Sequence, residues 1–411
     1  MARREELGVA VWGAAAFGAL LASYAAFRPV RDALVLDGDP DQIPWLFTAT
    51  FVAIAALSPA WSAAVARGPR HVVPVAFHVF VACELGFFLA IHAELAPVAV
   101  GRVFYVWSAV FNLFVVSVFW SLLADLLGPE RARRLYGPIA AGGTIGALVG
   151  PALTRALVGT IGVAGVLVMS AALLELAVIG VARVRRAAAS LPAAMAGDPP
   201  LAGGALAGIA RVARSRYLAA IVGYVLCTAC AATFVYLAQA RVVHDALPDR
   251  VARTEFFASL DVWVACATLV VQLALAAPLV GRLGPGLVLC ALPIVQACGI
   301  SLIVASPSLA AVAVVVVVGK TATHGLTRPA RELLFTVVSR EDKYRAKNAI
   351  DTVAYRFGDL GSGWLDRALV AAGGAALVAV ALPLAVAWIG LAVALGVAFR
   401  RRAAFTTQEQ P

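Results

Sequence analysis

The sequence places five charged or titratable side chains inside one strongly apolar stretch, at 308–336. They are Lys320, His324, Arg328, Arg331 and Glu332. On a regular α-helix the four basic positions share one side, because offsets of four, eight and eleven residues return close to the same direction. Charges inside an apolar span are costly, so this side is expected to face a cavity, a carboxylate partner or an anionic ligand.

A second group of charges, Arg28, Arg31 and Asp32, closes the first apolar stretch. Pro29 lies among them and lacks the backbone N–H of a regular helix, so we expect the helix to be interrupted there. Transporters use interrupted helices beside charged groups to build binding sites. The alternative is an ordinary helix end whose charges anchor it at the membrane interface.

A third group, Asp351, Arg356 and Asp359, lies in the penultimate apolar stretch. Arg356 and Asp359 are three residues apart and can pair on one helix face. We expect the cations of the three groups to bind negative charge and the acids to position or neutralise them, with purely internal ion pairs as the alternative. The candidate substrate-binding residues are therefore Arg28, Arg31, Asp32, Lys320, His324, Arg328, Arg331, Glu332, Asp351, Arg356 and Asp359.

Three further acids, Glu84, Glu175 and Asp261, stand alone in apolar surroundings. We expect each to be a buried partner of the cations above. The alternative is that they carry protons, which keeps a proton-coupled mechanism open.

Other motifs favour packing over catalysis. The small-residue run at 142–150 lacks the Lys-Ser/Thr ending of a phosphate-binding loop, so it predicts close helix packing. Cys227 and Cys230 form a C-x-x-C inside an apolar stretch, where buried small side chains are expected rather than a redox or zinc site. No metal-ligand cluster, nucleophile motif or dinucleotide fingerprint stands out, so neither an enzyme nor a cofactor is expected.

The composition indicates that these elements lie in a membrane. Of 411 residues, 62% are hydrophobic and 14% charged, with a mean hydropathy of +0.91. Soluble proteins carry about 25% charged residues, so a soluble enzyme and a disordered chain are both excluded. The net charge of +10 then indicates basic cytoplasmic loops rather than a nucleic-acid polymer as partner.

Apolar runs of spanning length predict an all-α polytopic protein with twelve transmembrane helices. The expected helices lie near 8–30, 44–66, 71–93, 98–124, 138–158, 161–183, 214–240, 254–280, 285–306, 308–336, 348–370 and 374–399.

The distribution of Lys and Arg predicts the orientation. With the N-terminus inside, 21 cations fall in inner connections and six in outer ones, so both termini are expected to be cytoplasmic. A signal peptide is the alternative for the first span. The Pro- and Gly-containing connection at 184–213 is expected to be a cytoplasmic linker between six-helix bundles at 1–183 and 214–411. This arrangement resembles the major facilitator architecture.

Several motifs resemble the bacterial and plastid ADP,ATP carrier family. They are Arg28-Pro29-Val30-Arg31-Asp32 followed by Ile43-Pro44-Trp45-Leu46, the segment 130–136, and Lys347-Asn348-Ala349-Ile350-Asp351 followed by Arg356-Phe357-Gly358. Arg331-Glu332 lies where that family has a Lys-Glu pair. The resemblance implies a major-facilitator-like fold and exchange of nucleotides or related anions.

Two departures from that family bear on the substrate. Phe47 and Asp359 occupy positions where the resembling carriers have Lys. We therefore expect a secondary transporter, an antiporter in the bacterial inner membrane, for a small anionic solute, with nucleotide-like solutes favoured. The ligand is expected to carry fewer negative charges than ATP. A monomer surrounded by lipid is expected. The alternatives are a proton-coupled transporter of another metabolite and a membrane scaffold that transports nothing.

Overall fold

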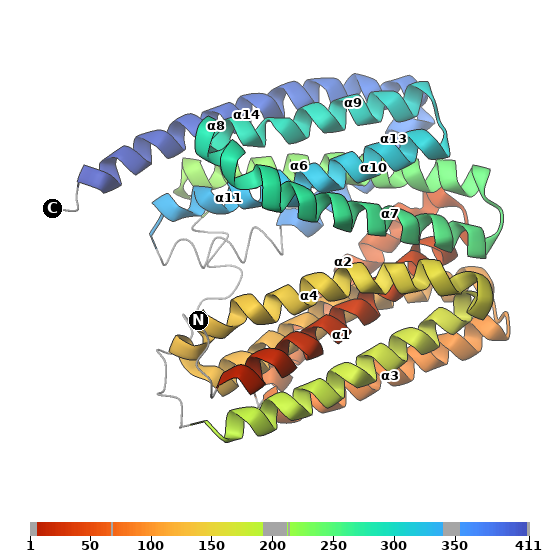
Figure 1. The fold of residues 1–411 in the computed structure, drawn as a ribbon. Helices are drawn as coiled ribbons and strands as arrows, with labels where there is room; N and C mark the ends of the chain where they lie inside the picture. Colours follow the sequence, from red (N-terminus) through yellow and green to blue (C-terminus); the bar gives the residue numbers. More distant parts are fainter. Residues whose placement is uncertain (1–5, 67–68, 192–211, 213, 340–353, 409–411) are drawn as a thin grey trace. The chain divides into compact units, whose positions relative to one another are not determined.

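A computed structural model describes residues 6–66, 69–191, 212, 214–339 and 354–408. Figure 1 shows helices joined by short turns, and the described residues contain no β-strand. This confirms the expected all-α class. The high apolar content explains it, because a chain in lipid must satisfy its backbone hydrogen bonds within each helix.

The chain forms two compact units, each described here by itself. Unit 1 contains Met1–Asp198 and Leu247–Val262, and unit 2 contains Pro199–Ala246 and Trp263–Pro411. The first half of α7 (Arg250–Val271) therefore groups with unit 1, whereas the sequence places it in the second bundle.

Unit 1 consists mainly of α1 (Leu7–Leu34), α2 (Ile43–Ala66), α3 (Pro69–His92) and α4 (Pro97–Ala189), with the short 3-10 turns η2 (Val35–Asp37) and η3 (Pro40–Gln42). α4 is kinked at Gly128 and Gly162, whose φ angles are 67° and 71°. Glycine adopts positive φ without steric cost, so these residues divide α4 into segments 97–127, 129–161 and 163–189.

Unit 2 contains α6, two π-helical turns and a series of shorter helices. They are α6 (Arg216–Ala246), the end of α7, η4 (Gln272–Ala276), α8 (Ala277–Leu289), α9 (Ala291–Ala305), α10 (Leu309–Thr321), η5 (Ala322–Thr327), α11 (Arg328–Leu334), η6 (Phe335–Val337), α13 (Tyr355–Ala371) and α14 (Gly374–Gln408). Gly284, with φ of 76°, turns the chain within α8.

Eight helices among the described residues are long and apolar enough to cross a membrane. Two of these, Pro97–Ala189 and Arg250–Leu289, continue through the glycine kinks. Divided at the kinks, the described helices follow the twelve expected ranges. The main boundary difference is the second segment of α4, which begins at Pro129 rather than near 138 because the charged residues 130–136 are also helical.

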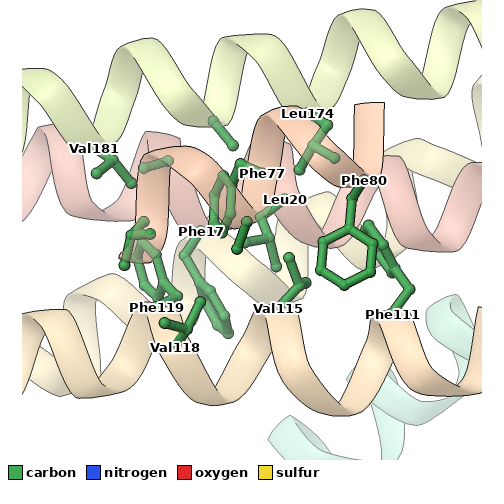
Figure 2. Close-up of a cluster of buried hydrophobic side chains, with 14 of the residues drawn as sticks. Phe17, Leu20, Phe77, Phe80, Phe111, Val115, Val118, Phe119, Leu174 and Val181 are labelled. Carbon is green, nitrogen blue, oxygen red and sulfur yellow. The ribbon is translucent and has the colours of Figure 1, made fainter. Parts of the chain in front are cut away.

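Aromatic side chains fill the core of unit 1. Figure 2 shows Phe17 and Leu20 of α1 meeting Phe77 and Phe80 of α3 and, from α4, Phe111, Val115, Val118, Phe119, Leu174 and Val181. The rings of Phe17 and Phe119 stack with centroids 5.0 Å apart, and Phe80 meets Phe111 edge-on at 4.9 Å. Each such pair contributes about 0.5–1.5 kcal/mol beyond the burial of its surface.

The small residues at 142–150 bring α4 against α1, which confirms the packing prediction. A Cβ added at Gly142, Gly146 or Gly150 would lie 2.1, 2.0 or 2.3 Å from a backbone carbonyl oxygen of α1. Only glycine therefore fits at these positions. The phosphate-loop interpretation has no support, because the segment lies within a helix.

Pro29 does not end α1, so the predicted interruption is wrong. The helix continues to Leu34 and then tightens into η2. The hydroxyl of Thr154 on α4 donates to the carbonyl of Ala26 at 2.7 Å, one turn before the proline. Pro29 leaves the carbonyl of Ala25, four residues earlier, without its helical donor, and the Thr154 bond ties α1 to α4 beside that position.

Candidate functional site

The apolar stretch that carries the basic residues is not a regular helix. α10 ends at Thr321, the π-helical turn η5 follows, and α11 begins at Arg328. A π turn bonds residue i to i+5 and inserts one residue, so Arg328 and Arg331 are rotated by about 100° from the positions that a regular helix would give them. Arg328 then lies about 20° and Arg331 about 80° from the direction of Lys320, so the expected narrow stripe becomes a broader face of one continuous helical segment.

A second π turn supports the first. η4 packs against η5, and the Gln272 side-chain amide donates to the backbone carbonyl of His324 at 3.1 Å. Gly325 lets the two segments approach, since a Cβ there would lie 2.8 Å from Val271. π turns occur often at functional sites, so η4 and η5 indicate that this part of unit 2 is a candidate site.

Arginines from α11 and α13 converge on Tyr355. The hydroxyl of Tyr355 lies within electrostatic range of Arg328, Arg331, Arg356 and Asp359. Arg328 is exposed, whereas Tyr355 and the other three are half-buried. Three guanidinium groups and one carboxylate therefore lie near the same phenol.

The Asp359 carboxylate is held from a second helix. Thr233 on α6 donates to Asp359 Oδ1 at 3.3 Å. Two turns further along α13, the fully buried Asp366 bonds to Arg241 on α6. Nothing in the sequence pairs these two residues, which lie 125 positions apart on different helices.

The predicted anion-binding residues in unit 1 form ion pairs. Arg28 contacts Asp261 of α7 at 2.7 Å, and Arg31 contacts Asp32 at 2.7 Å. The guanidinium of Arg31 also lies over the ring of Tyr105, 5.1 Å from its centroid.

Phe47 belongs to the same neighbourhood of unit 1. Its ring meets Tyr105 with centroids 6.4 Å apart, on the ring that carries Arg31. An aromatic side chain therefore stands where the resembling carriers have a cation.

Two arginines at the start of α7 bind η2, the turn that follows α1, and nothing in the sequence beyond their charge indicates this role. Arg250 and Arg253 contact Asp37 at 2.9 and 3.5 Å. Arg253, of which 5% is exposed, also donates to the carbonyl of Leu36 at 2.9 Å. These contacts explain why the first half of α7 groups with unit 1.

The lone acids behave differently from one another. Asp261 is a buried partner of Arg28, as predicted. Glu175 lies 3.8 Å from His78, with both side chains substantially exposed. Glu84 has no ion pair among the described residues, so its expected role as a partner of a cation is wrong; its carboxyl contacts Ser170 instead.

The predicted site residues therefore divide between the units. Arg28, Arg31 and Asp32 belong to unit 1, and the residues from Lys320 to Asp359 belong to unit 2. Lys320 and Glu332 are half-buried and His324 is exposed. Asp351 lies outside the described residues. Cys227 and Cys230 are free thiols on α6, and the described part of the chain holds no cluster of metal-ligating side chains.

Solved transporters share this fold. The nucleoside transporter NupG matches with a TM-score of 0.61 at 14% identity over 97% of this chain and 99% of its own. A bacterial homologue of the iron transporter ferroportin in an inward-facing state matches with a TM-score of 0.64 at 14% identity, over 96% and 98%. A POT family transporter in complex with 5-aminolevulinic acid matches with a TM-score of 0.63 at 10% identity, over 95% and 96%.

The sequence comparison identifies the family. No curated protein matches the chain with significance. The sequence profile of the Major Facilitator Superfamily, however, matches residues 8–344. Because this match covers most of the chain, the protein belongs to the Major Facilitator Superfamily and is a membrane transporter, not an enzyme.

Proposed function

We propose that this protein is a secondary active transporter of a small organic anion, working by alternating access. The observation that carries the proposal is the convergence of Arg328, Arg331 and Arg356 on Tyr355, with Asp359 as the carboxylate among them. The group contains three guanidinium groups and one carboxylate. We propose an anionic ligand because planar guanidinium groups suit the paired oxygens of phosphate or carboxylate.

We further propose that the solute is nucleotide-like and carries fewer charges than ATP. The motifs at 28–32, 43–46, 130–136 and 347–358 resemble the ADP,ATP carriers. Phe47 and Asp359 replace cations of that family, which disfavours a triphosphate. A structural relative, NupG, is itself a nucleoside transporter. A nucleoside monophosphate combines these properties.

Ligand-induced stabilisation tests the site. A ligand that binds only the folded state raises the melting temperature, so AMP, ADP, ATP, ribose 5-phosphate and citrate are compared on purified protein. AMP is expected to raise it most in the wild type. Arg328→Ala is expected to abolish the effect, and Arg328→Lys to restore little of it, because Lys is a point charge without the fork geometry.

The matched control is Arg282→Ala, which removes another exposed arginine of unit 2. It is expected to retain the wild-type response to AMP. Equal loss of the response in both variants would show a general charge effect and would refute the site. No response of the wild type to any of these anions would refute the proposed ligand class.

We propose that both termini and the connection at 184–213 are cytoplasmic, that the chain lies in the bacterial inner membrane, and that it acts as a monomer. The excess of Lys and Arg in the inner connections supports this orientation. A cysteine introduced at Gly197 should then resist impermeant thiol reagents applied to intact cells. Its modification from outside would reverse the orientation.

A further inference from the structure

A buried carboxyl lies at the meeting point of three helices in unit 1. Glu84 belongs to α3, and 0% of its surface is exposed. Its Oε1 lies 3.1 Å from the hydroxyl oxygen of Ser170 on α4. The Ser170 hydroxyl lies 2.9 Å from that of Ser23 on α1. Buried apolar and aromatic side chains, including Phe80 and Leu174, form the surrounding core.

The available donors favour a neutral Glu84. Ser170 has one hydroxyl proton, yet its oxygen lies within hydrogen-bonding distance of Glu84 and of both the hydroxyl and the carbonyl of Ser23, the carbonyl at 3.1 Å. Glu84 Oε2 is buried without a hydrogen-bond partner. A carboxylate in this place would be poorly solvated, which is costly. A carboxylic acid instead donates to Ser170, whose own proton then serves the Ser23 carbonyl.

No neighbouring cation compensates a negative charge on Glu84. Within two turns of the three residues, the titratable side chains of their own helices are His78, Cys83, Tyr24, Arg28 and Glu175. The first segment of α4 adds Arg102, Tyr105 and Asp125, its second segment adds Glu130, Arg131, Arg133, Arg134, Tyr136 and Arg155, and α2 has none. Among all described groups, only the Ser170 and Ser23 hydroxyls interact with the carboxyl, so an ionised Glu84 would have two neutral hydroxyl donors at most and no cation. Arg28 is paired with Asp261, and His78 faces Glu175.

We propose that Glu84, with Ser23 and Ser170, forms a proton-binding site inside unit 1 that is occupied in this conformation. The site gives the transporter a group whose charge changes when helices α1, α3 and α4 separate and admit water. The inference goes beyond the proposed function, because it holds whatever solute is carried. A monovalent metal ion is the competing ligand, since it would use the same oxygen atoms.

The pH dependence of unfolding tests the site. Unfolding exposes Glu84 to water, where a carboxyl ionises above about pH 4.3 and releases its proton. Stability is therefore greater at low pH, and this group lowers the folding equilibrium constant about tenfold per pH unit while the folded protein keeps its proton. Denaturant unfolding of the full chain in detergent between about pH 6 and 8 measures this slope.

Glu84→Gln, a neutral replacement of similar shape, is expected to lose the tenfold slope. Glu175→Gln, which alters a partly exposed acid of the same unit, is expected to retain it. The same slope in wild type and Glu84→Gln would overturn the proposal. So would a wild-type stability that Na⁺ raises and choline does not, provided that Glu84→Gln abolishes this difference, because the ligand would then be a metal ion.

Infrared spectroscopy gives a readout that does not require Glu84→Gln to fold. The wild type is expected to show the C=O stretching band of a protonated carboxyl at neutral pH. Ser170→Ala removes the group to which this acid donates and is expected to shift the band. Absence of the band, or a band that Ser170→Ala leaves unmoved, would overturn the proposal.

Discussion

Replacing Gly146 by alanine tests the interface between α1 and α4, on which the core of unit 1 depends. The added methyl group would lie 2.0 Å from the carbonyl oxygen of Gly18, whereas ordinary contacts begin at 3.4 Å. The methyl carbon is fixed to the backbone of α4 and the carbonyl oxygen belongs to the backbone of α1, so no side-chain rotation relieves the overlap. The two helices would have to separate by about 1.4 Å, the difference between these distances.

Separation of this size would also weaken the contacts at Gly142 and Gly150, which are equally close to α1. Overpacking a well-packed interior costs about 1–3 kcal/mol when side chains can adjust, and here they cannot. We therefore expect a loss of at least about 3 kcal/mol, against which the better helix propensity of alanine returns about 0.5–1 kcal/mol.

Thermal unfolding in detergent measures the effect, with Gly159→Ala as the matched control. Gly159 lies in the same segment of α4, and a Cβ there meets nothing within 4 Å. Its alanine variant is expected to melt at or slightly above the wild-type temperature. Gly146→Ala is expected to melt several degrees lower. If both variants melt together with the wild type, the helices are not as close as described and the packing argument fails.

Three further substitutions test individual charges. Asp366→Ala is expected to cost about 3–5 kcal/mol of stability, because it leaves Arg241 without its buried partner; a melting temperature equal to that of the wild type would contradict this. A double-mutant cycle of Arg28→Met and Asp261→Asn is expected to give a positive coupling energy, whereas additive effects would show that the pair contributes nothing. Asp359→Lys is expected to improve ATP binding relative to AMP by at least about tenfold in a competition assay, as about 1.4 kcal/mol of added attraction requires. An unchanged ratio would show that Asp359 has no influence on substrate charge.

Hydropathy predicted the helices well, because a transmembrane helix needs about 20 consecutive apolar residues and such runs are rare in other kinds of structure. It could not predict the π turns η4 and η5. A π turn is a local shift of backbone hydrogen bonds that hydropathy does not record, and the contact beside it joins Gln272 to the His324 carbonyl, 52 residues away in the sequence. The expected stripe of basic residues requires a regular helix, whereas the π turn inserts an extra residue there.

At Pro29 the sequence predicts an irregularity that the structure does not contain. The local cost of proline predicted a break, yet Thr154 from another helix bonds the carbonyl of Ala26 and α1 continues. The glycines at 142–150 were predicted correctly because their effect is local to the side chain they lack. Tertiary contacts decide the outcome wherever a residue's backbone cost can be met by a neighbour.

Two groups of arginines that look alike in the sequence have different charged neighbours in the structure. Arg28 and Arg31 stand in a charged segment with one adjacent acid, as Arg328 and Arg331 do beside Glu332. In unit 1, Asp261 from α7 and the neighbouring Asp32 hold the two guanidinium groups. In unit 2, Arg356 arrives from α13 and adds positive charge, with Asp359 on the same helix. Folding therefore brings different residues to the two groups of arginines. Acids pair with Arg28 and Arg31, whereas Arg328 and Arg331 share the surroundings of Tyr355 with Arg356 and Asp359, which is why we propose the anion site in unit 2. The binding roles of Arg28 and Arg31 stay predictions that Arg328→Ala and Arg28→Met, compared on the same AMP response, will separate.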